Sequence, residues 1–189
     1  MKEKRFKEAI DVLKGFEKKE KDLMARAANN LSFLYFLEGD VEQADKYANV
    51  AVRTDRYNAR ALVNKGNCLY AAGELERAKE LYLESIGVDA SCAEAIYNLG
   101  LVNKRMGNHS ESLQAFEKLH TLIPSSEEVL YQIASLHDIL GDYRQAIKWF
   151  NILIARVPTD PDVLSRIGQI HNKDNNETQA YHYQMDSYK

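Results

Sequence analysis

The stretch Ala93-Glu94-Ala95-Ile96-Tyr97-Asn98-Leu99-Gly100 carries the pattern that decides the fold. Its last residue belongs to a series of small residues spaced 34 apart: Ser32, Gly66, Gly100, Ala134 and Gly168. Two further series share this spacing, one of turn residues (Gly39, Gly73, Gly107, Gly141, Asn175) and one of small residues (Ala44, Ala78, Ser112, Ala146, Ala180). Three series with one period indicate an array of structural repeats.

The spacing of 34 residues is the period of the tetratricopeptide repeat (TPR), in which each unit is a pair of antiparallel helices. In the quoted stretch Ile96 replaces the tryptophan of the TPR consensus, and Leu99-Gly100 matches it. No segment shows the pattern of a β-strand. The sequence therefore predicts an all-α fold, a right-handed superhelical solenoid of antiparallel helix pairs.

We expect one TPR array over residues 1–189. Its expected parts are the end of a preceding repeat and a linker (1–24), full repeats (25–58, 59–92, 93–126 and 127–160) and a truncated repeat (161–189). The helix that opens the first full repeat should extend backwards through Glu20–Leu23, because no helix breaker occurs there. Apolar residues on the last helix (Tyr181, Tyr183, Met185, Tyr188) suggest a fragment of a longer solenoid, able to stack end to end.

Small residues and turn residues have distinct roles in this pattern. A small residue such as Gly66 lets the paired helix approach closely, and we expect it to face the small residue Ala78. Glycines of the Gly39 series should end the first helices in the left-handed conformation. Helix starts are predicted at two capping boxes, Ser91-x-x-Glu94 and Ser125-x-x-Glu128, and at the N-cap Asp160 before Pro161.

Composition excludes several classes of function. The net charge is −3 and charged residues make up 28% of the chain, so no strong field favours nucleic acid or a membrane surface. No segment approaches the roughly 20 apolar residues of a membrane span, and the charged N-terminus does not resemble a signal peptide. The two cysteines suit a reducing compartment. We therefore expect a cytoplasmic protein with protein partners, no nucleic acid and no membrane insertion.

No catalytic or metal-binding constellation is evident. Cys68 and Cys92 are 24 residues apart and have no partners at metal-ligand spacing. We interpret Cys68 as a core residue and Cys92, at a helix start, as an inert thiol. His137 and His171 occupy a position where TPR helices pack, so we interpret both as packed rings. The sequence predicts a protein that is not an enzyme and has no cofactor or metal.

The concave face of the array is the candidate site. Its residues come from inward-facing positions of the first helices, and each has an alternative role in packing within its own repeat. Aromatic rings with amides and a few charges suit a peptide held in a groove. The candidates are Arg26, Asn29, Phe33, Phe36, Arg60, Asn67, Tyr70, Tyr97, Leu101, Lys104, Arg105, Tyr131 and Asp138.

A clamp for a terminal carboxylate, as in co-chaperone TPR domains, is disfavoured. That clamp needs lysine and asparagine in one repeat, asparagine in the next, and a basic pair in the third. Here Val63, Asn67 and Asn98 are followed by Glu128 and Gln132 where the cations should be. An acidic tail would be repelled. A register one repeat earlier gives Asn29, Phe33, Asn64, Glu94 and Asn98, again without a cation.

Several stretches are more specific than the TPR consensus. They include residues 9–19 (AIDVLKGFEKK), 30–35 (NLSFLY), 55–58 (DRYN), 61–67 (ALVNKGN), 128–134 (EVLYQIA) and 157–161 (VPTDP). Together these stretches resemble the polaris-type TPR subunit of intraflagellar transport complex B over nearly the whole chain. The differences fall mainly at 107–109 and 173–184.

The resemblance implies a non-enzymatic scaffold needed for assembly of cilia and flagella. It implies other complex B subunits as partners, and a location in the cilium or flagellum and at the basal body. Two other interpretations stay open: the TPR arm of a multidomain enzyme such as a glycosyltransferase, and the disfavoured co-chaperone-like adaptor.

Overall fold

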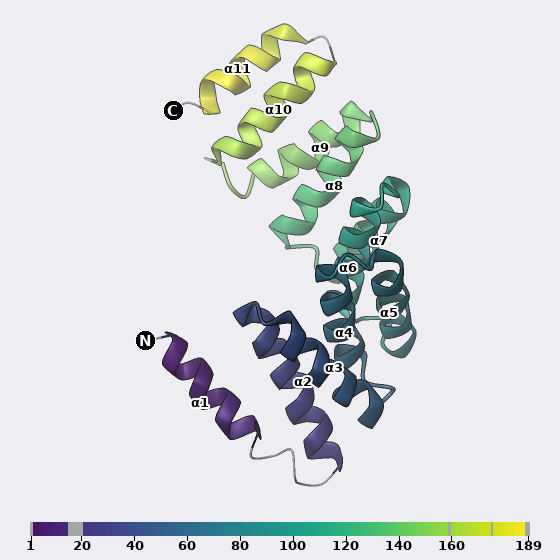
Figure 1. Cartoon of the computed structure of the whole chain (residues 1–189). Helices are drawn as coiled ribbons and strands as arrows, with labels where there is room; N and C mark the ends of the chain where they lie inside the picture. Colours follow the sequence, from purple (N-terminus) through teal and green to yellow (C-terminus); the bar gives the residue numbers. More distant parts are fainter. Residues whose placement is uncertain (1, 15–20, 159, 175, 188–189) are drawn as a thin grey trace. The chain divides into compact units, whose positions relative to one another are not determined.

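The computed structural model describes residues 2–14, 21–158, 160–174 and 176–187, and the regular structure in this part is entirely helical (Figure 1). The predicted all-α fold is confirmed. The helices are α1 (Lys2–Lys14), α2 (Lys21–Glu38), α3 (Val41–Thr54), α4 (Ala59–Ala71), α5 (Leu75–Val88), α6 (Ala93–Arg105), α7 (His109–Leu122), α8 (Glu127–Ile139), α9 (Tyr143–Ile154), α10 (Pro161–Lys173) and α11 (Glu177–Ser187). Helix α2 begins at Lys21, so it extends backwards over 21–23 as expected, and Glu20 lies outside the described residues.

The chain forms two compact units, Met1–Val102 and Asn103–Lys189, and the boundary between them falls inside α6. In the first unit α2 packs on α3, α4 packs on α5, and α3 also contacts α4 (Figure 1). In the second unit α8 packs on α9, α10 packs on α11, and α9 also contacts α10. Each unit is therefore built from helix pairs in which one pair packs on the next.

The turn after each first helix has the backbone conformation that the glycine series predicts. After α2, the N–H of Asp40 donates to the carbonyl of Tyr35 at 3.0 Å and closes the helix end. The left-handed conformation is confirmed by φ angles of 84°, 83°, 81° and 80° at Gly39, Gly73, Gly107 and Gly141. The fifth member of the series, Asn175, lies outside the described residues.

The helix starts follow the sequence prediction at one position and depart from it at two. Asp160 is the N-cap of α10 and accepts from the N–H groups of Asp162 and Val163, with Pro161 in the first turn, as predicted. At α8 the cap is Ser126, which accepts from the N–H of Val129 at 3.3 Å. The predicted box that begins at Ser125 was therefore wrong by one residue.

The box predicted at Ser91 was also wrong. The N–H and the hydroxyl of Ser91 both donate to Oδ1 of Asp89, at 2.9 Å and 2.7 Å, and α6 begins only at Ala93. A carboxylate is a stronger acceptor than a hydroxyl, and its bonds to Ser91 stabilise a local turn before the helix. These bonds hold the pKa of Asp89 below its usual value, with the Ser91 hydroxyl as the main cause.

Each unit has its own apolar core. In the first unit Leu31, Ala51 and Ala61 are buried together with Ile10 of α1. In the second unit the buried cluster joins three successive helices: Leu130 and Ala134 (α8), Ala146, Phe150 and Leu153 (α9), and Val163, Ile167 and Ile170 (α10). Tyr183 of α11 is partly buried and packs against it. Burial of one apolar face per helix is what holds such pairs together.

Gly66 is the place of closest approach between α4 and α5. A Cβ at Gly66 would lie only 2.6 Å from Cε1 of Tyr82, whose side chain is 1% exposed. The expected neighbour Ala78 is buried as well, but the three atoms nearest to this Cβ all belong to the Tyr82 ring. At Gly168 helix α11 approaches closely, because a Cβ there would lie 3.1 Å from Cγ of Gln184 and 3.3 Å from the carbonyl oxygen of Ala180.

The two cysteines lie inside the first unit. Cys68 is 2% exposed, and burial, followed by the nearby Asp45 carboxylate, raises its pKa to about 11. The interpretation of Cys68 as a core residue is confirmed. Cys92 is also buried; Ser85 Oγ donates to its Sγ at 3.8 Å, and that Sγ lies 3.8 Å from Glu94 Oε2.

We expect Gly66→Ala to destabilise the protein. The new methyl group would displace the Tyr82 ring, and overpacking of this kind costs about 1–3 kcal/mol, which exceeds the gain of about 1 kcal/mol in helix propensity. The matched control is Gly87→Ala in α5, where a Cβ would meet nothing within 4 Å. Urea denaturation should show opposite signs for the two variants; equal stabilisation by both would contradict the packing described here.

We expect the Cys68 thiol to react slowly in the folded protein. At pH 8 a pKa of about 11, against 9.0 for a free thiol, lowers the thiolate fraction about 100-fold. The measurement is the rate of labelling by a soluble disulfide reagent in a Cys92→Ser variant, with and without urea. Comparable rates in the folded and unfolded protein would contradict the burial of Cys68.

Candidate functional site

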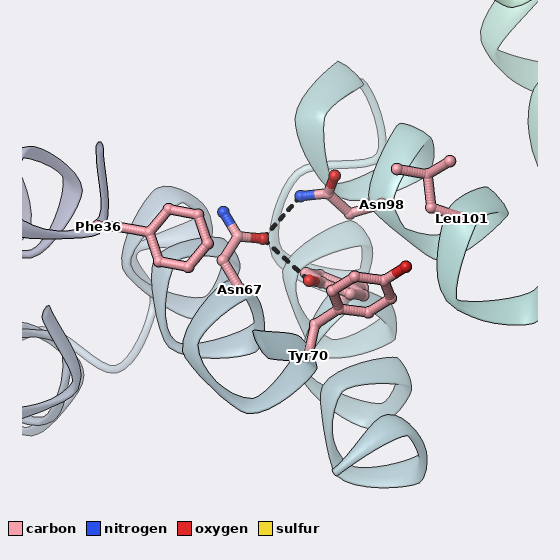
Figure 2. Close-up of a pocket in the computed structure, with 6 residues that line it drawn as sticks. Phe36, Asn67, Tyr70, Asn98 and Leu101 are labelled. Atoms are coloured by element: carbon pink, nitrogen blue, oxygen red, sulfur yellow. Dashed lines mark hydrogen bonds between the residues drawn. The ribbon is translucent and has the colours of Figure 1, made fainter. Parts of the chain in front are cut away.

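The first unit contains a hollow of about 210 Å³ on its described surface. Its lining residues, shown in Figure 2, come from α2 (Phe36), α4 (Asn67, Tyr70), α5 (Tyr82) and α6 (Asn98, Leu101). Three of these four helices are first helices of successive pairs. The hollow therefore lies where the repeat pattern brings equivalent faces of successive helices together.

The period of the sequence explains why these side chains meet. Phe36 and Tyr70 are 34 residues apart, and so are Asn67 and Leu101. Residues one period apart occupy the same face of successive first helices. Tyr82 reaches the hollow from the second helix of the pair, because Gly66 leaves room for its ring.

A pair of hydrogen bonds orders the polar wall of the hollow. Oδ1 of Asn67 accepts from the Tyr82 hydroxyl at 2.9 Å and from Nδ2 of Asn98 at 2.8 Å (Figure 2). Burial, followed by the proximity of Tyr70, raises the pKa of Tyr82 above its usual value. The phenol therefore remains a neutral donor, and the Asn67 side chain is held in one orientation.

The size and composition of the hollow suit a segment of protein. Its lining has no ionisable acid or base apart from two phenols. Its volume is below the roughly 300–1,000 Å³ of typical small-molecule sites. Neither a nucleophile with a neighbouring base nor a set of metal ligands lines it. The arrangement can hold an apolar side chain and hydrogen-bond a backbone.

His137 and His171 pack against neighbouring side chains of the second unit. His171 is buried and stacks on Tyr183, with ring centroids 5.5 Å apart and planes 13° apart. His137 is half-buried, and its Nδ1 lies 3.9 Å from Oδ2 of Asp142. The described residues include no group of three or more His, Cys, Asp or Glu side chains that could hold a metal ion.

The hollow brings together four of the residues that the sequence placed on the concave face: Phe36, Asn67, Tyr70 and Leu101. Five other candidates belong to the same unit. Asn29 is half-buried and accepts a hydrogen bond from Asn64, and Tyr97 is half-buried. The remaining three, Arg26, Phe33 and Arg60, are exposed.

The second unit holds the other four candidates, and their settings differ. Lys104 is half-buried and donates to Oε1 of Gln132 at 2.8 Å, whereas Arg105 is exposed. Tyr131 is 37% exposed, and its ring packs edge-on against Phe150 at 5.7 Å. Asp138 is only 4% exposed and is ion-paired within the unit, so its carboxylate does not face solvent as a concave surface residue would.

Sequence reasoning did not include Tyr82 or Asn98 in the site. A signal for Asn98 was present, because polar residues recur 34 apart at Asn30, Asn64, Asn98, Gln132 and Arg166. The last four of these side chains each contact a polar residue of the preceding first helix. The contacts are Asn64 with Asn29, Asn98 with Asn67, Gln132 with Lys104, and Arg166 with Asp138. We call these four contacts the polar column.

None of the described helices has the length and apolar character that crossing a membrane requires.

A segment of 58 residues is 43% identical to the human Intraflagellar transport protein 88 homolog. The match covers 31% of this chain and 7% of that protein. The matched segment therefore covers only a small part of the length of this relative.

Solved structures share the fold at low sequence identity. MamA from Desulfovibrio magneticus RS-1 has a TM-score of 0.81 at 16% identity, covering 90% of this chain and 94% of that one. YrrB, described as a TPR protein with an unusual peptide-binding site, has a TM-score of 0.79 at 18% identity. The match covers 92% of this chain and 89% of that one. PilF of Pseudomonas aeruginosa has a TM-score of 0.75 at 21% identity, covering 87% and 75%.

Two family models of the tetratricopeptide repeat match the chain. One matches residues 38–87 and 63–127, and the other matches residues 127–154. These ranges together cover more than half of the 189 residues. With the helix pairs and the glycine turns, they show that the chain belongs to the tetratricopeptide repeat family, whose members are protein-interaction scaffolds.

Proposed function

We propose that the hollow in the first unit binds an extended segment of a partner protein. The observation that carries this proposal is the unused hydrogen-bonding capacity of its polar wall. Among the described residues, no hydrogen bond uses the amide nitrogen of Asn67 as a donor or Oδ1 of Asn98 as an acceptor. In Figure 2 both atoms lie away from the dashed hydrogen bonds.

An extended peptide presents the complementary groups. Its carbonyl oxygens accept hydrogen bonds and its N–H groups donate them, whatever its side chains are. Asn67 would donate to a carbonyl, and Asn98 would accept from an N–H group. The bond between the two amides fixes both side chains before binding, which lowers the entropy lost on association.

The apolar lining supplies the second part of the recognition. Phe36, Tyr70 and Leu101 surround the hollow, and aromatic residues are enriched at the centres of protein interfaces. A volume of about 210 Å³ accommodates a single large side chain next to the bound backbone. We therefore expect the partner segment to carry an apolar anchor residue.

We further propose that the chain is part of a core subunit of intraflagellar transport complex B. The resembling stretches span most of the chain, and the segment that is 43% identical to the human Intraflagellar transport protein 88 homolog supports them. In this role the chain acts as a non-enzymatic scaffold in the cilium or flagellum and at the basal body. Its partners are other subunits of the complex.

Affinity capture from a ciliated-cell extract tests the complex B assignment. We expect the tagged chain to enrich several core complex B subunits over a tagged TPR chain of similar length and charge. Quantitative mass spectrometry provides the measurement. Equal recovery of complex B subunits by the two tagged chains would contradict the assignment.

We expect Asn98→Ala to weaken capture of the partner about tenfold. The substitution removes the acceptor for the bound backbone and also releases Asn67, and each lost hydrogen bond contributes about 0.5–1.5 kcal/mol. The matched control is Asn49→Ala on α3, where the amide bonds only to Asp45 one turn earlier. Titrations of the captured partner should separate the two variants, while equal affinity would contradict binding at the hollow.

A further inference from the structure

The second unit has a group of three cations that the hollow of the first unit does not involve. They are Lys104 near the end of α6 and Arg166 and Lys173 on α10, and we call them the basic cluster. Their polar neighbours are Gln132 and Asp138 on α8. All five residues are described and belong to the unit Asn103–Lys189.

Asp138 neutralises only part of the charge of the basic cluster. Its side chain is 1% exposed; Nζ of Lys173 lies 2.6 Å from Oδ1, and Nη2 of Arg166 lies 2.8 Å from Oδ2. The arginine contact is an ion pair whose angle falls outside that of a hydrogen bond. One carboxylate is therefore shared by two cations, and the cluster keeps an excess of two positive charges.

Lys104 is held by a neutral group. Its Nζ donates to the amide oxygen of Gln132 at 2.8 Å, and the side chain is half-buried. Burial and then the like charge of Arg166 lower the pKa of Lys104. Such an ammonium group has lost part of its hydration and lies near another cation. An approaching anion therefore stabilises its charged form.

The cluster can be reached from solvent. The side chain of Arg166 is 35% exposed and that of Lys173 is 45% exposed. Asp174, the C-cap residue that follows Lys173, is one acid beside the cluster. At the start of α8 two more acids, Glu127 and Glu128, oppose an anionic ligand, and Glu128 precedes Asp138 by ten residues. That separation is about 15 Å along the helix, so the Arg166 and Lys173 end is remote from it.

We propose that the basic cluster binds a glutamate or aspartate side chain in an acidic segment of a partner protein. This inference rests on the proposed scaffold function, but it concerns a different unit from the hollow. A carboxylate is the anion that every acidic protein segment carries, and it can accept charge-assisted hydrogen bonds from lysine and arginine, so it is the occupant that we test, with a phosphate group as the alternative outcome. The chain as a whole has a net charge of −3, so it does not attract acidic proteins in general. The positive charge of the basic cluster favours partner segments with an acidic residue at this place.

A defined peptide probe tests the inference on the full chain. The probe is a fluorescein-labelled peptide of alternating glutamate and alanine, compared with the same peptide carrying glutamine or phosphoserine in place of glutamate. Fluorescence anisotropy is measured at about 20 mM salt, where charges act over longer distances, and again at about 150 mM. We expect the glutamate peptide to bind, more weakly at high salt, and to bind better than the other two.

Substitutions of single lysines test whether the peptide binds at the basic cluster. Lys173→Gln and Lys104→Gln should each weaken binding about threefold, in keeping with about 0.6 kcal/mol per partly exposed charge. Lys173→Arg should retain it. Lys118→Gln is the matched control, because it removes one exposed cation from α7 of the same unit.

Circular dichroism and the melting temperature report whether each variant folds. Asp138 keeps Arg166 as its partner in Lys173→Gln, so we expect this variant to fold. Equal affinity for the glutamate and glutamine peptides, tighter binding of the phosphoserine peptide, or an equal loss in Lys118→Gln would each overturn the inference. The two proposals can fail separately. If the glutamate peptide does not bind the basic cluster but Asn98→Ala still weakens capture of the partner, the hollow remains the proposed binding site.

Discussion

Hydrogen bonds and ion pairs of the polar column constrain how one first helix packs on the next. Apolar contacts alone are non-directional, so they allow neighbouring helices to slide. In the column, both donors of the Asn64 amide go to Asn29, one to its backbone carbonyl and one to its side chain. A shift by one turn, about 5.4 Å, would break these bonds. Each unpaired amide would then cost about 1–3 kcal/mol.

The column also connects the two helices of a pair at one position. Gly66 admits the Tyr82 ring, the Tyr82 hydroxyl bonds to Asn67, and Asn67 bonds to Asn98. This chain of contacts runs from α5 through α4 to α6. Because the two bonds occupy Oδ1 of Asn67, they hold its NH₂ group in one orientation. The packing of the glycine thus determines which polar groups the hollow presents.

Features that depend on local rules could be predicted from the sequence, and features that depend on distant neighbours could not. The left-handed turn at Gly39 and the Asp160 cap follow from the preferences of one or two residues. Tyr82 beside Gly66 was missed because a repeat period relates equivalent positions and does not specify which residue faces which across a pair. Asp138 occupies an inward-facing position of the repeat, so the sequence placed it on the concave face. Its burial depends on ion pairs with Arg166 and Lys173 of the following repeat, which the period does not specify.

The same column positions carry different chemistry in the two units. In the first unit the contacts join neutral amides, whereas in the second they join Lys104 to Gln132 and Arg166 to Asp138. Neutral amides recognise a peptide backbone, which every protein has, so they provide affinity with little selectivity. Unbalanced cations distinguish acidic segments from others and favour fast association. A repeat array can therefore retain its packing geometry while it changes its partner, because in both proposed binding sites residues that hold successive helices in register are also the residues that contact the ligand.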